Sequence, residues 1–217
     1  MGFRLPYVDR AQAGRVLATH LTGARADLVL GLPRGGVAVA APVAAALDVP
    51  LDAWCVRKIG VPGQPELALG AVASGGVRVL DDAMARRAGL TADDVDALTA
   101  RERAELARKE RTLRPNRPPI DVAGRQVLVV DDGLATGASA RAACLALRAA
   151  GAASVVLAVP VAPQQGLDDI APVVDGIVCP ATPPHFWAVG HWYDDFSEVT
   201  DREVVALLSA SASPGTS

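Results

Sequence analysis

The sequence has few cysteines, no long apolar run and no recognisable leader, and each shortage excludes a class of protein. Its three cysteines, Cys55, Cys144 and Cys179, lie far apart and form no C-x-x-C pair, so neither a disulfide framework nor a zinc site is predicted. The longest apolar run, 37–47, contains a proline and is shorter than the roughly 18 residues of a membrane span. The first ten residues do not have the pattern of a signal peptide. We therefore expect a reduced, cytoplasmic setting and no membrane partner.

An excess of charge of one sign is also lacking. Charged residues make up 21% of the 217 residues and the formal net charge is -3, so no global basic field is present to hold nucleic acid. We expect no nucleic-acid partner, and any site for an anionic ligand must be local. The length suits one large domain, or one domain with an insertion.

Short apolar segments and helical patterns alternate along the chain, which is typical of an α/β protein. Strands are predicted at 27–33, 51–57, 126–130, 154–159 and 174–179, and helices at 11–21, 37–47, 139–150 and 164–170. Repeated strand–helix units imply a mostly parallel, twisted sheet flanked by helices. We assign 1–208 to a single domain and predict a disordered tail over 209–217, which is small and polar.

Two segments depart from this alternation. The stretch 59–66 contains two prolines and two glycines and predicts an irregular loop, which two short strands joined by a tight turn then follow. From Thr91 to about Arg114 the chain is charge-dense with a helical period and a thin apolar stripe, so it predicts a helix on the outside of the core. We treat 82–119 as an accessory helical insertion; a subunit contact is the alternative role for its charged helix.

The segment 129–139, VVDDGLATGAS, carries the residues best suited to chemistry. It predicts a buried strand, then Asp131 and Asp132 at its carboxyl end, then a glycine-bearing turn into a helix. Ligands of open α/β sheets bind at this edge. A helix N-terminus with small and hydroxyl residues suits one phosphate monoester, and the residues of this 5-phosphate loop are Ala135, Thr136, Gly137, Ala138 and Ser139.

The two acids complete a sugar-phosphate site. Carboxylates accept hydrogen bonds from hydroxyl groups and attract Mg²⁺, directly or through water, so Asp131 and Asp132 predict a diol beside the phosphate, as in a ribose 5-phosphate. The turn is no nucleoside-triphosphate P-loop, because no lysine follows Gly137. The alternative is structural: acids that cap a turn and a helix start that needs a hydroxyl.

These eleven residues resemble the signature of the type I phosphoribosyltransferases. The resemblance implies a Rossmann-like core with a small hood. It extends to GLPRGG at 31–36, which looks like the pyrophosphate loop of the family, where Arg34 and the amides of Gly35 and Gly36 would hold the leaving diphosphate; a plain turn is the alternative. It also implies that Lys58, at the entry to 59–66, acts with Arg34 beside a mobile catalytic loop, against the alternative of a solvated loop.

Aromatic residues gather near the C-terminus, where five of the eight lie between 186 and 196. By resemblance to purine-salvage members of the family, Phe186 or Trp187 would stack on an acceptor ring, and Asp194 would lie near Mg²⁺. The sequence departs from those members at 179–184, which supplies no purine-reading lysine. The alternative is packing or a dimer contact, above all for Trp192, Tyr193 and Phe196; the roles of His185 and His191 stay open.

The resemblance implies transfer of the 5-phosphoribosyl group from phosphoribosyl diphosphate (PRPP) to a nitrogenous acceptor such as a nucleobase-like ring. Mg²⁺ is the implied cofactor, pyrophosphate the second product, and a homodimer the implied assembly. Two alternatives remain: a regulator of the same fold that binds PRPP or a nucleotide without catalysis, and a hydrolase in which water replaces the acceptor.

Overall fold

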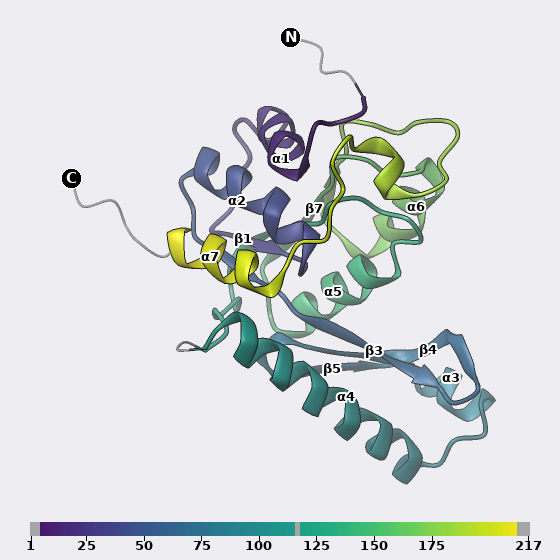
Figure 1. Cartoon of the computed structure of the whole chain (residues 1–217). Helices are drawn as coiled ribbons and strands as arrows, with labels where there is room; N and C mark the ends of the chain where they lie inside the picture. Colours follow the sequence, from purple (N-terminus) through teal and green to yellow (C-terminus); the bar gives the residue numbers. More distant parts are fainter. Residues whose placement is uncertain (1–4, 116–117, 212–217) are drawn as a thin grey trace.

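A five-stranded parallel sheet forms the centre of the larger part of the molecule, in the order β2-β1-β6-β7-β8 (Figure 1). In this computed structural model, which describes residues 5–115 and 118–211, the strands are β1 (Leu28–Gly31), β2 (Leu51–Ala53), β6 (Gln126–Val130), β7 (Ser154–Ala158) and β8 (Gly176–Val178). Every neighbouring pair is parallel, which confirms the predicted sheet. Gly31 of β1 is in register with Val130 of β6, so the segments that follow these two strands begin side by side.

Helices cover both faces of this sheet. One face packs against α1 (Arg10–Thr19), α2 (Gly35–Leu47) and α7 (Asp201–Ser211), and the other against α5 (Ala138–Ala149), α6 (Gln164–Ile170) and the short η2 (Ala171–Val173). Consecutive residues of β1 enter the two cores alternately: Val29 lies in the first, Leu28 and Leu30 in the second. A strand buried on both faces must be apolar throughout, which explains why short continuous apolar runs predicted these strands.

A second, antiparallel sheet in the order β3-β4-β5 lies beside this body (Figure 1). Its strands are β3 (Val56–Val61), β4 (Gln64–Ala73) and β5 (Val77–Leu80), with the turn η1 (Ser74–Gly76) between the last two as predicted. The predicted irregular loop over 59–66 is wrong, because β3 and β4 form a hairpin there. Pro62 and Gly63 make the tight turn: proline fixes the first corner, and Gly63 supplies the positive φ of 74° at the second.

The accessory segment contains α3 (Asp82–Arg87) and the long α4 (Ala92–Leu113). Thr91 and Asp94 form a reciprocal capping box that starts α4. The helix packs against β3 and β4 on one face of the small sheet, while α5 packs on the opposite face. The apolar stripe faces the protein as predicted, with these residues buried or packed against the core: Val95, Leu98, Leu106 and Leu113.

The last helix is a feature that the sequence analysis missed. α7 extends to Ser211, so the predicted tail over 209–217 is wrong for 209–211, while 212–217 lies outside the described residues. A capping box starts the helix, since Thr200 and Glu203 exchange backbone-to-side-chain hydrogen bonds of 2.6 and 3.2 Å. The T-x-x-E spacing was therefore a readable signal. No helix in the described part of the chain is long and apolar enough to cross a membrane.

Candidate active site

Two consecutive carboxylates follow the central strand β6, at the edge of the sheet predicted to bind ligand. Asp131 accepts a hydrogen bond from the backbone N–H of Asp132 at 2.9 Å. The Asp132 carboxylate accepts one from Arg10 Nε at 2.8 Å, and its backbone carbonyl accepts one from the Tyr193 hydroxyl at 2.6 Å. Elements distant in sequence, at both ends of the chain, therefore hold this acid pair.

The environment of the pair raises the pKa values of both acids. For Asp131 the main cause is burial, and the neighbouring charge of Asp132 adds to it, so its pKa lies well above the usual range. Burial also raises the pKa of Asp132, while the hydrogen bond and charge of Arg10 oppose the change. Two adjacent, poorly solvated carboxylates with one arginine favour a further cation or hydroxyl donors beside them.

The chemistry of this donor set fits Mg²⁺. Magnesium takes hard oxygen ligands and is usually held by one or two carboxylates together with substrate oxygens and water. Asp131 and Asp132 supply such carboxylates. Within 5–115 and 118–211, no group of three His, Cys, Asp or Glu side chains is placed to hold a metal. Asp194 is accordingly not brought into a cluster with the pair: it is exposed, and its backbone N–H donates to the carbonyl of Tyr7 at 2.7 Å.

Arg10 is a site residue that the sequence analysis did not identify. Its Nη1 donates to the carbonyl of Ser197 at 2.8 Å, and its guanidinium lies 3.8 Å from the centre of the Phe196 ring. Only 11% of the side chain is exposed, so its charge acts in a poorly solvated place. Because 122 residues separate Arg10 from Asp132, no local sequence pattern could reveal the pair.

The start of α2 touches the acid pair directly. A Cβ atom at Gly35 would overlap Oδ2 of Asp132, and one at Gly36 would lie 2.6 Å from the carbonyl oxygen of Val130. Glycine is required at Gly36, because only a bare backbone fits so close to the end of β6, whereas a Cβ at Gly35 would push the Asp132 carboxylate aside. The predicted pyrophosphate loop and the acid pair therefore form one continuous surface.

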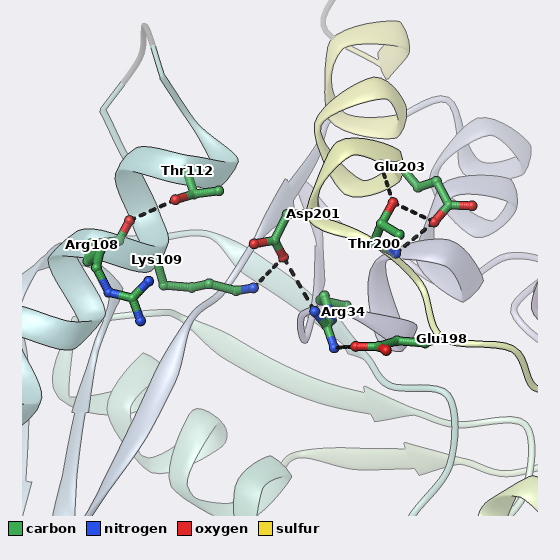
Figure 2. Close-up of polar contacts among 8 residues, drawn as sticks. All are labelled: Arg34, Arg108, Lys109, Thr112, Glu198, Thr200, Asp201 and Glu203. Carbon is green, nitrogen blue, oxygen red and sulfur yellow. Dashed lines mark hydrogen bonds and ion pairs between the residues drawn. The ribbon is translucent and has the colours of Figure 1, made fainter.

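Arg34 directs its side chain to the C-terminal part of the chain. It forms an ion pair with Glu198, and its Nη1 lies 3.9 Å from Asp201 in the first turn of α7 (Figure 2). The peptide bond between Pro33 and Arg34 is cis. The side chain remains 38% exposed, so a dissolved anion can reach it.

The predicted 5-phosphate loop, 135–139, forms the start of α5. Gly137 is the residue before the helix, with a φ of 69°, and no side chain caps the helix there. The Arg141 N–H bonds to the Gly137 carbonyl at 2.8 Å, so the amides before it lie ahead of the intrahelical ladder. Ala138 N–H has one long contact of 3.5 Å to Thr136 Oγ1. Thr136 and Ser139 are exposed, and such a helix start favours an anion.

The structure separates Lys58 from Arg34. Residues 57 and 58 are consecutive in β3, so their side chains point to opposite faces of the small sheet. Lys58 lines a cavity of about 490 Å³ between that sheet and α5, together with Ala138 and Arg141. Arg57 instead lines the cavity that contains Arg34, on the side of α4. Arg57, the neighbour of the predicted Lys58, therefore shares a cavity with Arg34.

The C-terminal aromatic residues divide into packed and exposed members. Tyr193 is buried and contacts Tyr7 and Phe196, with ring centres 5.5 and 5.0 Å apart. Phe186 is half-buried and stacks on Trp192 at 6.1 Å. Of the two residues predicted to contact the acceptor, Phe186 is thus partly covered, whereas Trp187 is 85% exposed. The two histidines of this segment are also exposed: His185 and His191.

Relatives are found over nearly the whole chain. The family described as phosphoribosyl transferase domain matches residues 11–195. Two proteins of Mycobacterium tuberculosis, from strains CDC 1551 and H37Rv, are provisionally named phosphoribosyl transferases; each is 50% identical over 202 residues, 92% of this chain and 46% of the relative. The chain thus spans less than half the length of these relatives. The crystal structure of TT1426 from Thermus thermophilus is similar with a TM-score of 0.88 and 42% identity, covering 96% of this chain and 100% of that one.

Proposed function

The chain belongs to the phosphoribosyl transferase family, and from that premise we propose that it transfers the 5-phosphoribosyl group of PRPP to a nitrogenous acceptor, with Mg²⁺, and releases pyrophosphate. The observation that carries the proposal is the close approach of Gly35 to Asp132. It joins the candidate diphosphate loop to the acid pair that precedes the candidate phosphate loop. A ribose with a phosphate at one end and a diphosphate at the other requires that order of groups.

Each part of the site has a role in this reaction. The free amides at the start of α5 would bind the 5-phosphate, and Asp131 and Asp132 would accept hydrogen bonds from the ribose hydroxyls. Arg34 would bind the departing diphosphate. Arg10 would fix the orientation of the Asp132 carboxylate. Bound Mg²⁺, held by the acid pair, would supply positive charge to the leaving group.

The acceptor would lie on the side of the exposed aromatic residue Trp187. An indole face that is open to solvent can stack on a planar nitrogenous ring, whereas Phe186 is already stacked on Trp192. We therefore favour Trp187 over Phe186 as the acceptor contact. A cytoplasmic location and a homodimer belong to the same proposal; the buried thiols of Cys55 and Cys144 fit a reducing compartment.

Product analysis tests this function against its two alternatives. Wild type is incubated with PRPP, Mg²⁺ and a panel of nitrogenous ring acceptors, and pyrophosphate is measured with and without acceptor. A transferase releases pyrophosphate only with an acceptor and forms the ribosylated ring; a hydrolase releases it without one. A regulator binds PRPP and releases none, which would contradict the proposed transfer.

Matched variants show whether the site is responsible. We expect Asp132→Asn to reduce turnover more than about tenfold, because the amide keeps the shape of the carboxylate but loses its charge. Asp121→Asn is the control, since Asp121 is exposed and lies in the turn before β6, at the strand end remote from the site. Equal activity of the two variants would contradict the role of Asp132.

A further inference from the structure

One carboxylate in this protein lies within reach of two cations from different elements. Asp201 Oδ1 forms an ion pair with Lys109 of α4 and lies 3.9 Å from Nη1 of Arg34, at the start of α2 (Figure 2). Two cationic groups therefore converge on a single oxygen. An anionic oxygen from a ligand, placed at the same point, would meet the same two groups.

These two cations lie on the wall of one cavity. It has a volume of about 380 Å³ and is lined by Arg34, Arg57, Arg108 and Lys109. Glu105 is the single acidic residue among the described residues that line this cavity. A multiply charged anion in this cavity would pair with more than one of these cations once it replaced the carboxylates that hold them.

Each of these four cations is paired with a carboxylate of the protein itself. Arg57 is paired with Glu102 at 2.6 Å and Arg108 with Glu105 at 2.8 Å. Arg57 and Arg108 are both paired with acids of α4, whereas the partner acids of Arg34 and Lys109 lie outside α4. Glu198 lies in the segment before α7 and Asp201 in its first turn, so these ion pairs can open without a change inside α4.

The two elements that carry Lys109 and Asp201 are each held in place independently. The end of α4 is anchored by Arg114, which is buried and donates to Asp52 at 3.0 Å and to Ser74 Oγ at 3.1 Å. The start of α7 is closed by the capping box of Thr200 and Glu203, and Val204 buries the helix against the core. The backbone of Lys109 is thus held five residues before this anchor at Arg114, rather than on a loose surface helix.

We propose that Lys109 is a second cation of the diphosphate site, and that Asp201 takes, in the ligand-free protein, the position of a phosphoryl oxygen. This inference rests on the proposed function, and it assigns a binding role to the accessory helix. A bound diphosphate displaces Asp201 and is held between Arg34 and Lys109. Until it is displaced, the Asp201 carboxylate competes with other anions for Arg34 and Lys109 and keeps the affinity of the site for those anions low.

The composition of the chain makes Lys109 easy to follow. Its 217 residues include two lysines, Lys58 and Lys109, and Lys58 faces a different cavity. Wild type is treated with a limiting amine-acylating reagent, with Mg²⁺ and either inorganic pyrophosphate or ribose 5-phosphate, and acylation of each lysine is measured by peptide mass spectrometry. We expect pyrophosphate to slow acylation of Lys109 at least about threefold, and ribose 5-phosphate to leave it unchanged.

Calorimetric titration of magnesium pyrophosphate into variants tests the same site by affinity. Lys109→Met should weaken binding by about fivefold or more, because one charge-assisted contact is lost, and Lys109→Arg should restore most of it. Asp201→Asn should tighten binding, because Arg34 and Lys109 lose the carboxylate that competes with the anion for them. Arg111→Met is the control, since this exposed arginine lies on α4 two residues away and lines none of the cavities described above.

The outcomes separate this inference from the proposed function. Protection of Lys109 together with weaker binding by Lys109→Met and tighter binding by Asp201→Asn supports it. Pyrophosphate binding that is lost in Arg34→Met but equal in Lys109→Met and Arg111→Met overturns the inference and leaves the proposed function standing. A folded wild type that binds neither pyrophosphate nor ribose 5-phosphate overturns both.

Discussion

At the end of β6, two adjacent carboxylates lie partly buried with one arginine beside them. Their pKa values are raised chiefly by burial. A carboxyl group whose pKa is higher in the folded than in the unfolded state stabilises the fold while it is protonated. That stability is fully present below the unfolded value, near about 4, and is lost as the pH rises through the folded value. The acid pair thus lowers stability at neutral pH.

Because ionised Asp131 destabilises the fold at neutral pH, Asp131→Asn should stabilise it. The amide can still accept the hydrogen bond from the Asp132 N–H but carries no charge, so it should raise Tm at pH 7 by about 2–4 °C in the presence of EDTA, or about 1 kcal/mol for a chain of this size. The gain should vanish near about pH 4, where the wild-type acid is protonated. Thermal unfolding from pH 4 to pH 8 measures it, with Asp121→Asn as the control. A lower Tm at pH 7 would contradict the account.

Residues that hold the acid pair show what sequence reasoning could not reach. Asp131 and Asp132 were identified because strand, acids and turn are contiguous. Arg10 and Tyr193 contact Asp132 from opposite ends of the chain, and an arginine in an N-terminal helix or a tyrosine among other aromatic residues has no local signature of such a contact. Their roles follow from the fold alone.

The start of α2 is the element on which the proposed site depends most. Gly35→Ala should displace the Asp132 carboxylate and disturb its pairing with Arg10, because the new Cβ and Asp132 Oδ2 cannot occupy the same place. We expect PRPP affinity to fall by about tenfold or more, while the helix persists because alanine favours it. Calorimetry with Gly176→Ala as the control tests this, since a Cβ there meets side-chain atoms at an ordinary 3.7 Å. Equal affinities of the two variants would refute the close approach.

The C-terminal end of α4 depends on one buried arginine. Arg114 binds Asp52, the Ala53 carbonyl, Ser74 and Glu110. Arg114→Met should lower the free energy of unfolding by about 3–5 kcal/mol, because the buried Asp52 would lose its ion pair and hydrogen bond with Arg114. Urea unfolding measures the change against Arg111→Met, an exposed cation of the same helix. A loss no larger than that of the control would show that α4 is anchored in another way.

Element boundaries were predictable where one pattern dominated. The α6 range agrees at both ends, and α4 begins and ends within one residue of its prediction, because a cap and a proline-rich segment bound it. The β3–β4 hairpin was missed because prolines and glycines were taken to exclude regular structure over 59–66. In fact Pro62 and Gly63 form a two-residue turn, and the residues around them pair as strands.

At the scale of the whole molecule, the alternation of strand and helix patterns was sufficient to predict the parallel sheet. It could not show how the small sheet sits between α4 and α5, since that depends on contacts between segments far apart in sequence. This arrangement explains why neighbouring residues of β3, Arg57 and Lys58, face different cavities. It also brings α4 beside α7, where Lys109 meets Asp201.

The central claim, a PRPP site built on the acid pair, is tested most directly by calorimetric titration of PRPP with Mg²⁺ into wild type and the Asp131→Asn/Asp132→Asn double variant. The account predicts saturable binding to wild type, and binding at least about a hundredfold weaker to the folded double variant, since both carboxylates are lost. Equal affinity of the two proteins, or no binding to a folded wild type, would contradict it.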